Sequence, residues 1–412
     1  MAKQKKKKEK VLMTWWTDVI FTLASKIFLL FKYHVRYNRG ILKEYKNRGV
    51  MLIYTHYSNK DHYLIKASTN YRRVNFVLAS YFFFNKTLNR VLTAARAISK
   101  EQFKPDIKAI RQIKKVIDQN GMIAIAPAGQ TSMDGNSPFI SDAIVKLIRL
   151  CKCDVLALRL HGVYQTFPKW RKSKRKTRMW TEFVPVLRKE QLDSLTDEEI
   201  YRGVCSALDL RAFDELVATG NTITGKALAM GLEDAIVRCP KCGERISYES
   251  EGNTIKCSKC GNHAMMNKRG RFEKVIPSDM IYQDLPHWYA WQRETIGSEF
   301  ASGKVTLDEK VIMLSNIKEK TVLAECGEGH LVLKPDAFYY EGTLYGEPYK
   351  KEFKLDKIVQ LPFEPNVRFE VPDDEAMFRF IPTRDIRVIT EYVLIIDYLN
   401  MQREKEKHES NS

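Results

Sequence analysis

The order of apolar and polar positions predicts an α/β domain in the first half of the chain. Four short apolar runs have the length and composition of buried strands. They span residues 50–55, 74–80, 122–126 and 154–160. Helical periodicity at 105–119 and 141–150 separates them. Because strands that alternate with helices form sheets covered on both faces, we expect a mixed sheet with helices on each side.

A different pattern begins near residue 305, where short apolar runs are split by Gly, Asn, Pro and Asp. These runs span 311–314, 322–324, 331–333, 338–340, 353–355, 367–371 and 377–381. Residues 385–401 then show helical periodicity and close the series. Roughly seven strands followed by one helix resemble a PH-like or GRAM-like domain in their order.

These patterns divide the 412 residues into several domains, as a chain of this length favours. The expected segments are 1–39 (basic tail and amphipathic helix), 40–210 (α/β domain), 211–235 (connector), 236–268 (cysteine-rich ribbon), 269–304 (helical connector), 305–402 (β-rich domain) and 403–412 (polar tail). The polar tail is expected to be disordered, since it carries few apolar residues to pack.

An amphipathic helix is predicted after the basic run at residues 3–10. One face collects the polar residues Thr14, Asp18, Thr22, Ser25 and Lys26. The opposite face is apolar and carries Trp15, Trp16, Val19, Ile20, Leu23, Ile27 and Leu30. Two charges within the run disfavour a spanning helix. The pattern favours a helix that lies in an anionic membrane interface, and a helix packed on its own domain is the alternative.

The charge balance indicates an anionic partner. Lysine and arginine together number 68 and aspartate and glutamate 50, which gives a net charge of +18. A lipid surface, a nucleic acid or a phosphorylated substrate would each suit this excess. The densest basic stretch, residues 169–178, is bracketed by Trp170 and Trp180. It suits phospholipid headgroups, while a solvated hairpin rim and a single-stranded nucleic acid site are the alternatives.

Two C-x-x-C pairs among the eight cysteines predict a metal site. Cys239 and Cys242 are separated by a 14-residue spacer from Cys257 and Cys260. Two such knuckles place four thiolates around Zn²⁺ in tetrahedral geometry. Because a four-cysteine site leaves no open coordination position, we expect a structural zinc ribbon in a reducing compartment.

The candidate catalytic residues are His56 and Asp61, an H-x4-D pair directly after an apolar strand. A histidine can take a proton from an alcohol because its ordinary pKa lies near ~6.5. A carboxylate on the far ring nitrogen fixes the tautomer and stabilises the imidazolium that forms. The sequence contains no nucleophilic serine or cysteine motif, so direct attack by an acceptor hydroxyl on a thioester is the simpler mechanism. A surface histidine at a helix cap is the structural alternative.

Several blocks resemble the glycerolipid acyltransferase family, the lysophosphatidate acyltransferase-like proteins. Residues 55–61 (THYSNKD) resemble its N-H-x-S-x-x-D block, and residues 126–132 (APAGQTS) resemble its F-P-E-G-T-R-S block. Residues 97–100 (AISK) stand where the family ends a strand with a phosphate-binding arginine. Residues 162–170 resemble a Gly-x-Tyr…Pro-x-Trp stretch of bacterial members, some of which also carry a trailing zinc ribbon. The resemblance covers about residues 35–210.

The resemblance implies that His56 is the general base and that Asp61 orients it. The acceptor site that it implies comprises Ser58, Lys100 or Arg96, Pro127, Gly129, Gln130, Thr131 and Ser132. The family's Glu and Arg in the third block are Ala128 and Thr131 here, which puts recognition of a glycerol phosphate in doubt. Lys100 would supply a charge for phosphate but lacks the bidentate fork of arginine.

We therefore expect a phospholipid-biosynthetic O-acyltransferase that is peripheral to the cytoplasmic face of a membrane. It would move a fatty acyl group from acyl-CoA or acyl carrier protein to the hydroxyl of a lysophospholipid such as 1-acyl-glycerol-3-phosphate. Its cofactor would be one structural zinc, and a nucleic acid is the less favoured partner. Two alternatives are a catalytically weak or inactive paralogue and a basic zinc-ribbon adaptor that binds nucleic acid or protein.

Overall fold

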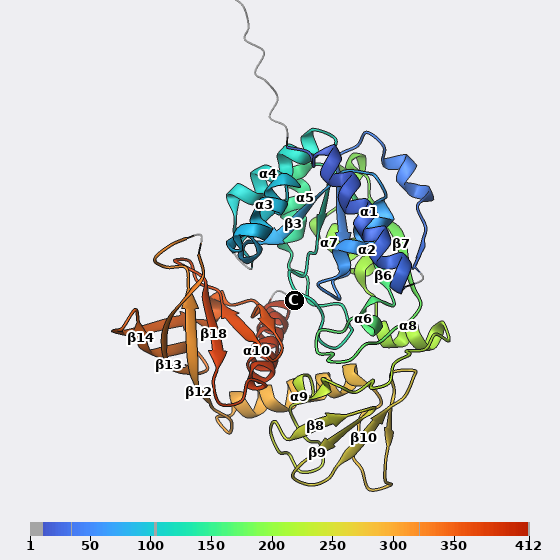
Figure 1. The fold of residues 1–412 in the computed structure, drawn as a ribbon. Coiled ribbons are helices and arrows are strands. Elements are labelled where there is room, and N and C mark those ends of the chain that lie inside the picture. The colour runs from blue at the N-terminus through green and yellow to red at the C-terminus, as the bar shows by residue number, and fades with distance from the viewer. Residues whose placement is uncertain (1–10, 34, 103–104, 321, 411–412) are drawn as a thin grey trace, which may run out of the picture.

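The computed structural model describes residues 11–33, 35–102, 105–320 and 322–410. These residues form an α/β domain, a small four-stranded domain and a β-rich domain that ends in a long helix (Figure 1). The basic run at residues 3–10 lies outside the described residues. None of the helices within these ranges combines the length and the hydrophobicity that crossing a bilayer requires.

The α/β domain follows the predicted alternation of strands and helices. Its strands are β1 (Val35–Tyr37), β2 (Val50–Tyr54), β3 (Val74–Ala79), β4 (Ile98–Lys100), β5 (Met122–Ile125), β6 (Asp154–His161) and β7 (Met179–Leu187). Its α-helices are α1 (Trp15–Lys32), α2 (Asp61–Thr69), α3 (Lys86–Ala94), α4 (Ile107–Asp118), α5 (Ala143–Cys151), α6 (Val163–Thr166), α7 (Asp197–Leu208) and α8 (Ala212–Ala218). Short 3-10 helices are η1 (Gly40–Tyr45), η2 (Ser80–Phe84) and η3 (Lys189–Ser194).

The mixed sheet of this domain has the strand order β1-β7-β6-β2-β5-β3-β4. Strands β6, β2, β5, β3 and β4 run parallel, whereas β7 runs antiparallel to β6. Helices cover both faces, α1 and α2 on one and α4, α5 and α7 on the other. Every residue of β2 is therefore buried, which explains its continuous apolar run. We call the side of the sheet where the parallel strands begin the amino edge, and the side where they end the carboxyl edge. Ligands of such sheets bind at the carboxyl edge.

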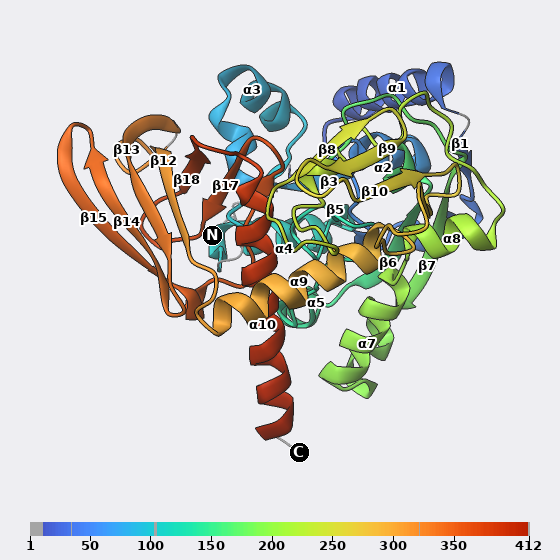
Figure 2. The same ribbon diagram turned by 90° about the horizontal axis from the view of Figure 1, so that it is seen from below.

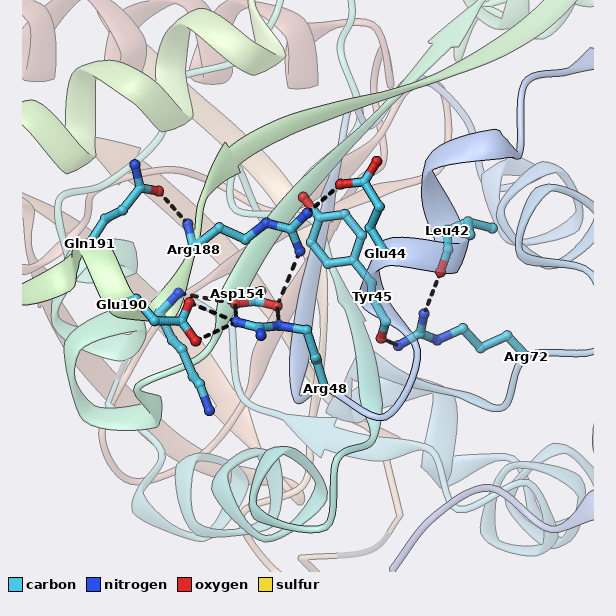
Figure 3. Close-up of polar contacts among 10 residues, drawn as sticks. Leu42, Glu44, Tyr45, Arg48, Arg72, Asp154, Arg188, Glu190 and Gln191 are labelled. Atoms are coloured by element: carbon cyan, nitrogen blue, oxygen red, sulfur yellow. Dashed lines mark hydrogen bonds and ion pairs between the residues drawn. The ribbon is translucent and has the colours of Figure 1, made fainter.

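A polar network closes the amino edge, where β2 and β6 begin (Figure 3). Arg48 donates to both oxygens of Asp154, with an Nη2–Oδ1 distance of 2.8 Å, and also to Glu190. The Arg188 guanidinium lies 3.6 Å from Asp154, and the Lys189 amide donates to it at 3.0 Å. Although burial alone would raise it, these hydrogen bonds and charges hold the pKa of Asp154 below its usual value. The network fixes the starts of two central strands.

The helix α1 packs on α2 through its polar face, which reverses the usual arrangement of an amphipathic helix. Asp18 forms an ion pair with Lys66, and both side chains are buried together with Thr22 and Ser25. The apolar face is turned outward. Its exposed side chains, between 45% and 72% accessible, are Trp15, Trp16, Ile20, Leu23, Ile27 and Leu30. The helix and its two faces are as predicted, and the polar face lies inside because Lys66 provides the buried charge that Asp18 requires.

The small domain is a meander of β8 (Tyr248–Glu251), β9 (Thr254–Cys257), β10 (His263–Met266) and β11 (Phe272–Lys274). It is followed by α9 (Leu285–Ala301), which crosses the long C-terminal helix (Figure 2). The segment predicted as a connector, 211–235, has structure of its own. This segment contains α8 and η4 (Leu232–Asp234), and Leu216, Ile223 and Leu228 are buried. Its apolar residues lack periodicity because they pack between the α/β domain and the small domain.

The β-rich domain is one antiparallel sheet with the order β15-β14-β13-β12-β18-β17-β16. Its elements are β12 (Leu307–Ser315), β13 (Ala324–Leu333), β14 (Ala337–Leu344), β15 (Glu347–Lys354), η5 (Leu355–Lys357), β16 (Phe363–Glu364), β17 (Arg368–Val371), β18 (Phe378–Pro382) and α10 (Val388–Ser410). Two strands were predicted at 322–324 and 331–333, but Ala324 and residues 331–333 are the two ends of the single strand β13. The polar and glycine-containing middle of β13 is held by β12 and β14.

The tail from residue 403, predicted to be disordered, is instead helical as far as Ser410. Arg403 fixes this part of α10, because its Nη1 donates to Leu355 O at 2.7 Å and to Asn400 Oδ1 at 3.1 Å. The glutamate and lysine residues that follow are good helix formers, which favours continuation of the helix.

Candidate active site

The candidate active site lies at the carboxyl edge, in the turn between β2 and α2. β2 ends at Tyr54 and α2 begins at Asp61, so His56 lies in the connecting turn. Ser58 Oγ accepts a hydrogen bond from Lys60 N at 3.1 Å, and Asp61 N donates to Ser58 O at 3.2 Å. These bonds place Asp61 in the first turn of the helix, where the partial positive charge of the helix terminus favours a carboxylate.

His56 and Asp61 are in direct contact. His56 Nδ1 lies 2.7 Å from Asp61 Oδ2. The same oxygen accepts hydrogen bonds from the amides of Tyr57, at 2.9 Å, and Ser58, at 3.1 Å. Asp61 is buried, whereas the His56 side chain is 22% exposed. A buried carboxylate thus orients an imidazole that solvent and substrate can reach.

The electrostatics of this pair suit a proton acceptor. A carboxylate oxygen that already accepts from two amides also accepts from Nδ1, so Nδ1 carries the ring proton and Nε2 keeps its lone pair. Burial raises the pKa of Asp61, and the hydrogen bond and charge of His56 lower it in part. The second oxygen, Oδ1, is buried and has no hydrogen-bonding partner among the described residues.

The loop after β5 touches the turn that carries His56. Ser132 N donates to His56 O at 3.0 Å, so the loop is tied to the main chain of the candidate base. Gly129 O accepts a hydrogen bond from Gln102 Nε2 at 2.6 Å. Gln102 thereby positions the loop, although no motif in the sequence indicates this role. The first and third blocks of the resemblance are therefore adjacent in space.

The remaining loop residues differ in their surroundings. Ser132 Oγ accepts from Gly135 N at 2.9 Å and contacts Asp134 at 3.1 Å, so its hydroxyl holds the loop. Gln130 Oε1 is buried and has no hydrogen-bonding partner among the described residues. Pro127 and Thr131 are half-buried in the same loop. A ligand that reached this loop could therefore satisfy the Gln130 amide.

Of the two candidate phosphate ligands, one is at the carboxyl edge and the other is not. Lys100 is the last residue of β4, pairs with Ala79 of β3, and has a pKa that burial lowers. Arg96 precedes β4 and has a left-handed φ of 54°. Its Nη1 donates to Leu12 O at 2.8 Å, toward the amino edge. The structure therefore brings Lys100, and not Arg96, to the edge that holds His56.

The four predicted metal ligands lie together in the small domain. The Sγ atoms of Cys239, Cys242, Cys257 and Cys260 are all within 4.8 Å of one another. Two of these distances are 3.6 Å (Cys239–Cys260) and 3.8 Å (Cys242–Cys257). Tetrahedral Zn²⁺ with Zn–S bonds of about 2.3 Å requires sulfur atoms about 3.8 Å apart, so the donor set fits zinc.

Glycine conformation makes both knuckles possible. Gly243 and Gly261 follow the second cysteine of each pair and have φ values of 72° and 73°. Their amides donate to Cys239 O at 2.9 Å and Cys257 O at 3.0 Å. Residues with a Cβ adopt this left-handed conformation rarely, so glycine allows the chain to turn around the metal.

The basic stretch at 169–178 is anchored in the interior by two side chains, while Lys172, Lys174, Lys176 and Arg178 are exposed. Trp170 and Arg175 are buried, and the Arg175 guanidinium lies 4.9 Å from the Trp170 ring. Arg175 Nη1 donates to Leu228 O at 3.2 Å. Lys172 pairs with Glu233 at 2.8 Å. These contacts join the stretch to the segment before the small domain.

A cavity of about 370 Å³ lies outside this site, beside β1 and β7. It is lined by Arg36, Tyr37, Asn38, Arg178, Trp180, Thr181, Thr219 and Asn221. None of the candidate catalytic or acceptor-site residues contributes to its walls, so the candidate active site does not include it.

No protein-family model matches the chain, and no curated protein matches it significantly. Among solved structures, the chain is similar to the 1-acyl-sn-glycerophosphate (LPA) acyltransferase PlsC from Thermotoga maritima. The likeness has a TM-score of 0.36 and 14% sequence identity, and it covers 46% of this chain and 78% of that one. A likeness of this size decides neither the fold nor the function, which rest on the residues and contacts described above.

Proposed function

We propose that this protein is an O-acyltransferase in which His56 is the general base and Asp61 its orienting carboxylate. The observation that carries the proposal is the 2.7 Å contact between His56 Nδ1 and Asp61 Oδ2 at the carboxyl edge of the sheet. An accessible Nε2 with a free lone pair is what deprotonation of a hydroxyl requires. The hydrogen bond from Ser132 N to His56 O supports an acceptor site that extends onto the loop after β5.

The proposed reaction is direct transfer. His56 Nε2 takes the proton of the acceptor hydroxyl while its oxygen attacks the carbonyl carbon of an acyl thioester. The resulting tetrahedral intermediate collapses when the C–S bond breaks, and the thiolate leaves with the proton from His56. Asp61 stabilises the imidazolium between these steps, so no acyl-enzyme forms.

The proposed donor is acyl-CoA or acyl carrier protein, and the proposed acceptor is a lysophospholipid such as 1-acyl-glycerol-3-phosphate. Lys100 supports an anionic acceptor, because it is the cation at the carboxyl end of β4. Ala128 and Thr131 provide no charge in the loop after β5, so the acceptor is held differently from the pattern that the family resemblance implies.

The test is an acyl-transfer assay with labelled palmitoyl-CoA and palmitoyl-acyl carrier protein. Each donor is paired with lysophosphatidate, lysophosphatidylglycerol and neutral monoacylglycerol. We expect a labelled diacyl product from at least one anionic acceptor, in amounts that grow with enzyme concentration. If no donor and acceptor pair gives product with folded, zinc-loaded protein, the chain is an inactive paralogue or an adaptor.

We further propose that the protein binds the cytoplasmic face of a membrane peripherally through α1. Six large apolar side chains on one face of this helix are exposed, although its polar face is buried and ion-paired. An apolar surface of this kind is normal at a lipid interface and costly in water. Phe21 and Phe28 of α1 contact the ring of Tyr63 on α2, so a membrane-bound α1 would hold the candidate site close to lipid.

Vesicle co-sedimentation tests this proposal with the double variant Ile20→Ser/Ile27→Ser. Burial of a large aliphatic side chain contributes about 1.5–3 kcal/mol, so we expect at least roughly tenfold weaker binding to vesicles of phosphatidylglycerol and phosphatidylcholine. The matched control is Ile107→Ser, an equally exposed isoleucine on α4. Unchanged binding by the double variant would reject α1 as the membrane contact.

We propose one structural zinc held by Cys239, Cys242, Cys257 and Cys260. Tyr248 OH, 3.6 Å from Cys239 Sγ, and Ser247 Oγ, 3.2 Å from Cys257 Sγ, support thiolates at this position. Metal analysis should give one zinc per chain, and Cys242→Ser should lower that content and the thermal stability. A zinc-free native protein of equal stability would contradict the assignment.

We also propose that the β-rich domain is PH-like or GRAM-like. Its seven-stranded antiparallel order and the helix α10 that follows support this class. Arg245 of the small domain forms an ion pair with Glu391 of α10. This ion pair joins the domain that holds the zinc site to the β-rich domain.

A further inference from the structure

Two ring contacts join the β-rich domain to loops that leave the carboxyl edge of the α/β domain. Lys169 Nζ, after β6 and α6, lies 3.5 Å from the centre of the Phe363 ring on β16. Tyr81, in η2 directly after β3, lies beneath two guanidinium groups of the β-rich domain. The Arg368 carbon is 5.1 Å and the Arg379 carbon 5.7 Å from the centre of the Tyr81 ring.

The strand order shows what lies between these contacts. β2 and β5 are enclosed by β6 and β3 in the sequence β6-β2-β5-β3. The loops after β2 and β5 carry His56 and Gly129. A domain that touches the loops after both outer strands spans the loops of the inner two, over about 14 Å at three inter-strand spacings. In both views the strands of the β-rich domain lie beside the α/β domain, on the side of α3 (Figures 1 and 2).

The part of the β-rich domain that meets Tyr81 carries two arginines and two glutamates. Arg368 and Arg379 share one carboxylate, Glu370, at 2.6 Å and 2.7 Å. The Glu370 side chain is 4% exposed, whereas each arginine is 14% exposed. Glu364, which is more exposed, lies 3.8 Å from Arg368. Two guanidinium groups on one buried carboxylate leave donors free for a further anion, and Arg379 Nη1 has no partner among the described residues.

The pair of Arg368 and Arg379 lies at the Lys100 end of the carboxyl edge. Lys100 is paired with Ala79, and Tyr81 follows Ala79 by two residues. The pair is thus near the lysine that the proposed function places at the acceptor's anionic group. We infer that Arg368 and Arg379 of the β-rich domain bind the anionic headgroup of the acceptor lipid. They would replace the charge that Thr131 does not provide, and arginine suits phosphate through its bidentate fork.

The inference rests on the proposed acyl transfer and is tested through acceptor preference. At saturating donor, kcat/KM is measured for lysophosphatidate, lysophosphatidylglycerol and neutral monoacylglycerol with the native protein, Arg368→Gln and Arg379→Gln. We expect each variant to lose roughly tenfold or more of the preference for anionic over neutral acceptor, as loss of a charge-assisted hydrogen bond does. The matched control, Arg384→Gln, removes the same charge from an exposed site beyond the other end of β18 and should keep the preference.

The results of these assays distinguish failure of the headgroup inference from failure of the proposed acyl transfer. Equal losses for anionic and neutral acceptors would show that the arginines only hold the domains together and would overturn the inference. A raised KM for acyl-CoA with unchanged acceptor preference would assign the pair to the donor's phosphates and overturn it as well. A binding measurement without turnover uses hexanoyl-lysophosphatidate and calorimetry on the His56→Ala protein, with and without Arg379→Gln. If the native protein transfers no acyl group to any acceptor while this binding still depends on Arg379, the headgroup site is upheld and the proposed reaction is rejected.

Discussion

The two edges of the α/β sheet each hold a buried carboxyl group, and these groups differ in their partners. Asp154 at the amino edge is held by the permanent charges of Arg48 and Arg188 and by an amide, and its pKa is lowered. Asp61 at the carboxyl edge has a titratable partner, His56, and one oxygen without a partner, and its pKa is raised by burial. Asp154 begins β6, and Asp61 begins α2 after the neighbouring strand β2.

The difference distinguishes a carboxylate that stabilises the fold from one that prepares a proton transfer. Fixed cations compensate Asp154 fully, and its ionisation then favours the folded state. Among the described residues, no fixed positive charge is paired with Asp61. Its carboxylate is stabilised most when His56 acquires a proton during turnover. Substitution of each aspartate by asparagine should therefore affect different properties, activity at one edge and stability at the other.

The largest expected effect is on catalysis by Asp61→Asn. An asparagine amide cannot stabilise the imidazolium and can favour the wrong tautomer of His56, so we expect the acyl-transfer rate to fall roughly 10³–10⁴-fold. Steady-state rates per folded protein, with folding checked by circular dichroism, measure this loss. A fall of less than tenfold would show that the carboxylate has no catalytic role.

The second effect is on stability, in Asp154→Asn. Removing one partner of a buried ion pair leaves Arg48 and Arg188 without their shared anion, and we expect unfolding by urea to require about 3 kcal/mol less. The activity of the folded fraction should stay within twofold. Glu190→Gln is the matched control, because this partner of Arg48 is 58% exposed and its ion pair should contribute much less to stability. Equal losses in the two variants would remove the contrast between buried and exposed partners.

A smaller effect should appear in the pH dependence of stability. Asp154 has a lowered folded pKa, so its stabilisation is complete above the unfolded value of about 3.9 and is lost as the pH falls through the folded value. Asp61 has a raised folded pKa, so its ionisation costs stability above the folded value, and that cost disappears below about 3.9.

Urea midpoints between pH 3 and pH 7 for the native protein, Asp154→Asn and Asp61→Asn measure these opposite trends. As the pH falls, the stability advantage of the native protein over Asp154→Asn should shrink. As the pH falls, the stability of the native protein should rise relative to that of Asp61→Asn. Parallel changes in both comparisons would mean that the two carboxyl groups do not differ as described.

Local pattern was sufficient to predict the elements near the candidate site. The apolar run of β2, the following turn and the five-residue offset from His56 to Asp61 predicted a contact that needs only one turn and the start of a helix. The cysteine spacing predicted the cluster in the small domain for the same reason, since each knuckle is closed within a few residues. The amphipathic pattern of α1 predicted the helix and both faces.

Features that depend on distant residues were not predictable. The burial of the polar face of α1 depends on Lys66 of α2, which no pattern connects to Asp18. The middle of β13 is polar and glycine-containing, so only its neighbours β12 and β14 identify it as a strand. The contact of Arg368 and Arg379 with Tyr81 joins residues almost 300 positions apart. Tertiary partners, which a single sequence does not display, decide each of these cases.

The most direct test of the central claim is the acyl-transfer rate of His56→Ala, relative to the native protein, with the anionic acceptor that the native protein uses best. His56 is partly exposed and its substitution removes no buried charge, so the variant should fold, bind zinc and bind lipid vesicles as the native protein does. We expect its rate to fall at least about 10³-fold, because the base that deprotonates the acceptor is gone. A folded His56→Ala protein that keeps a tenth or more of the native rate would contradict the assignment of His56 as the catalytic base.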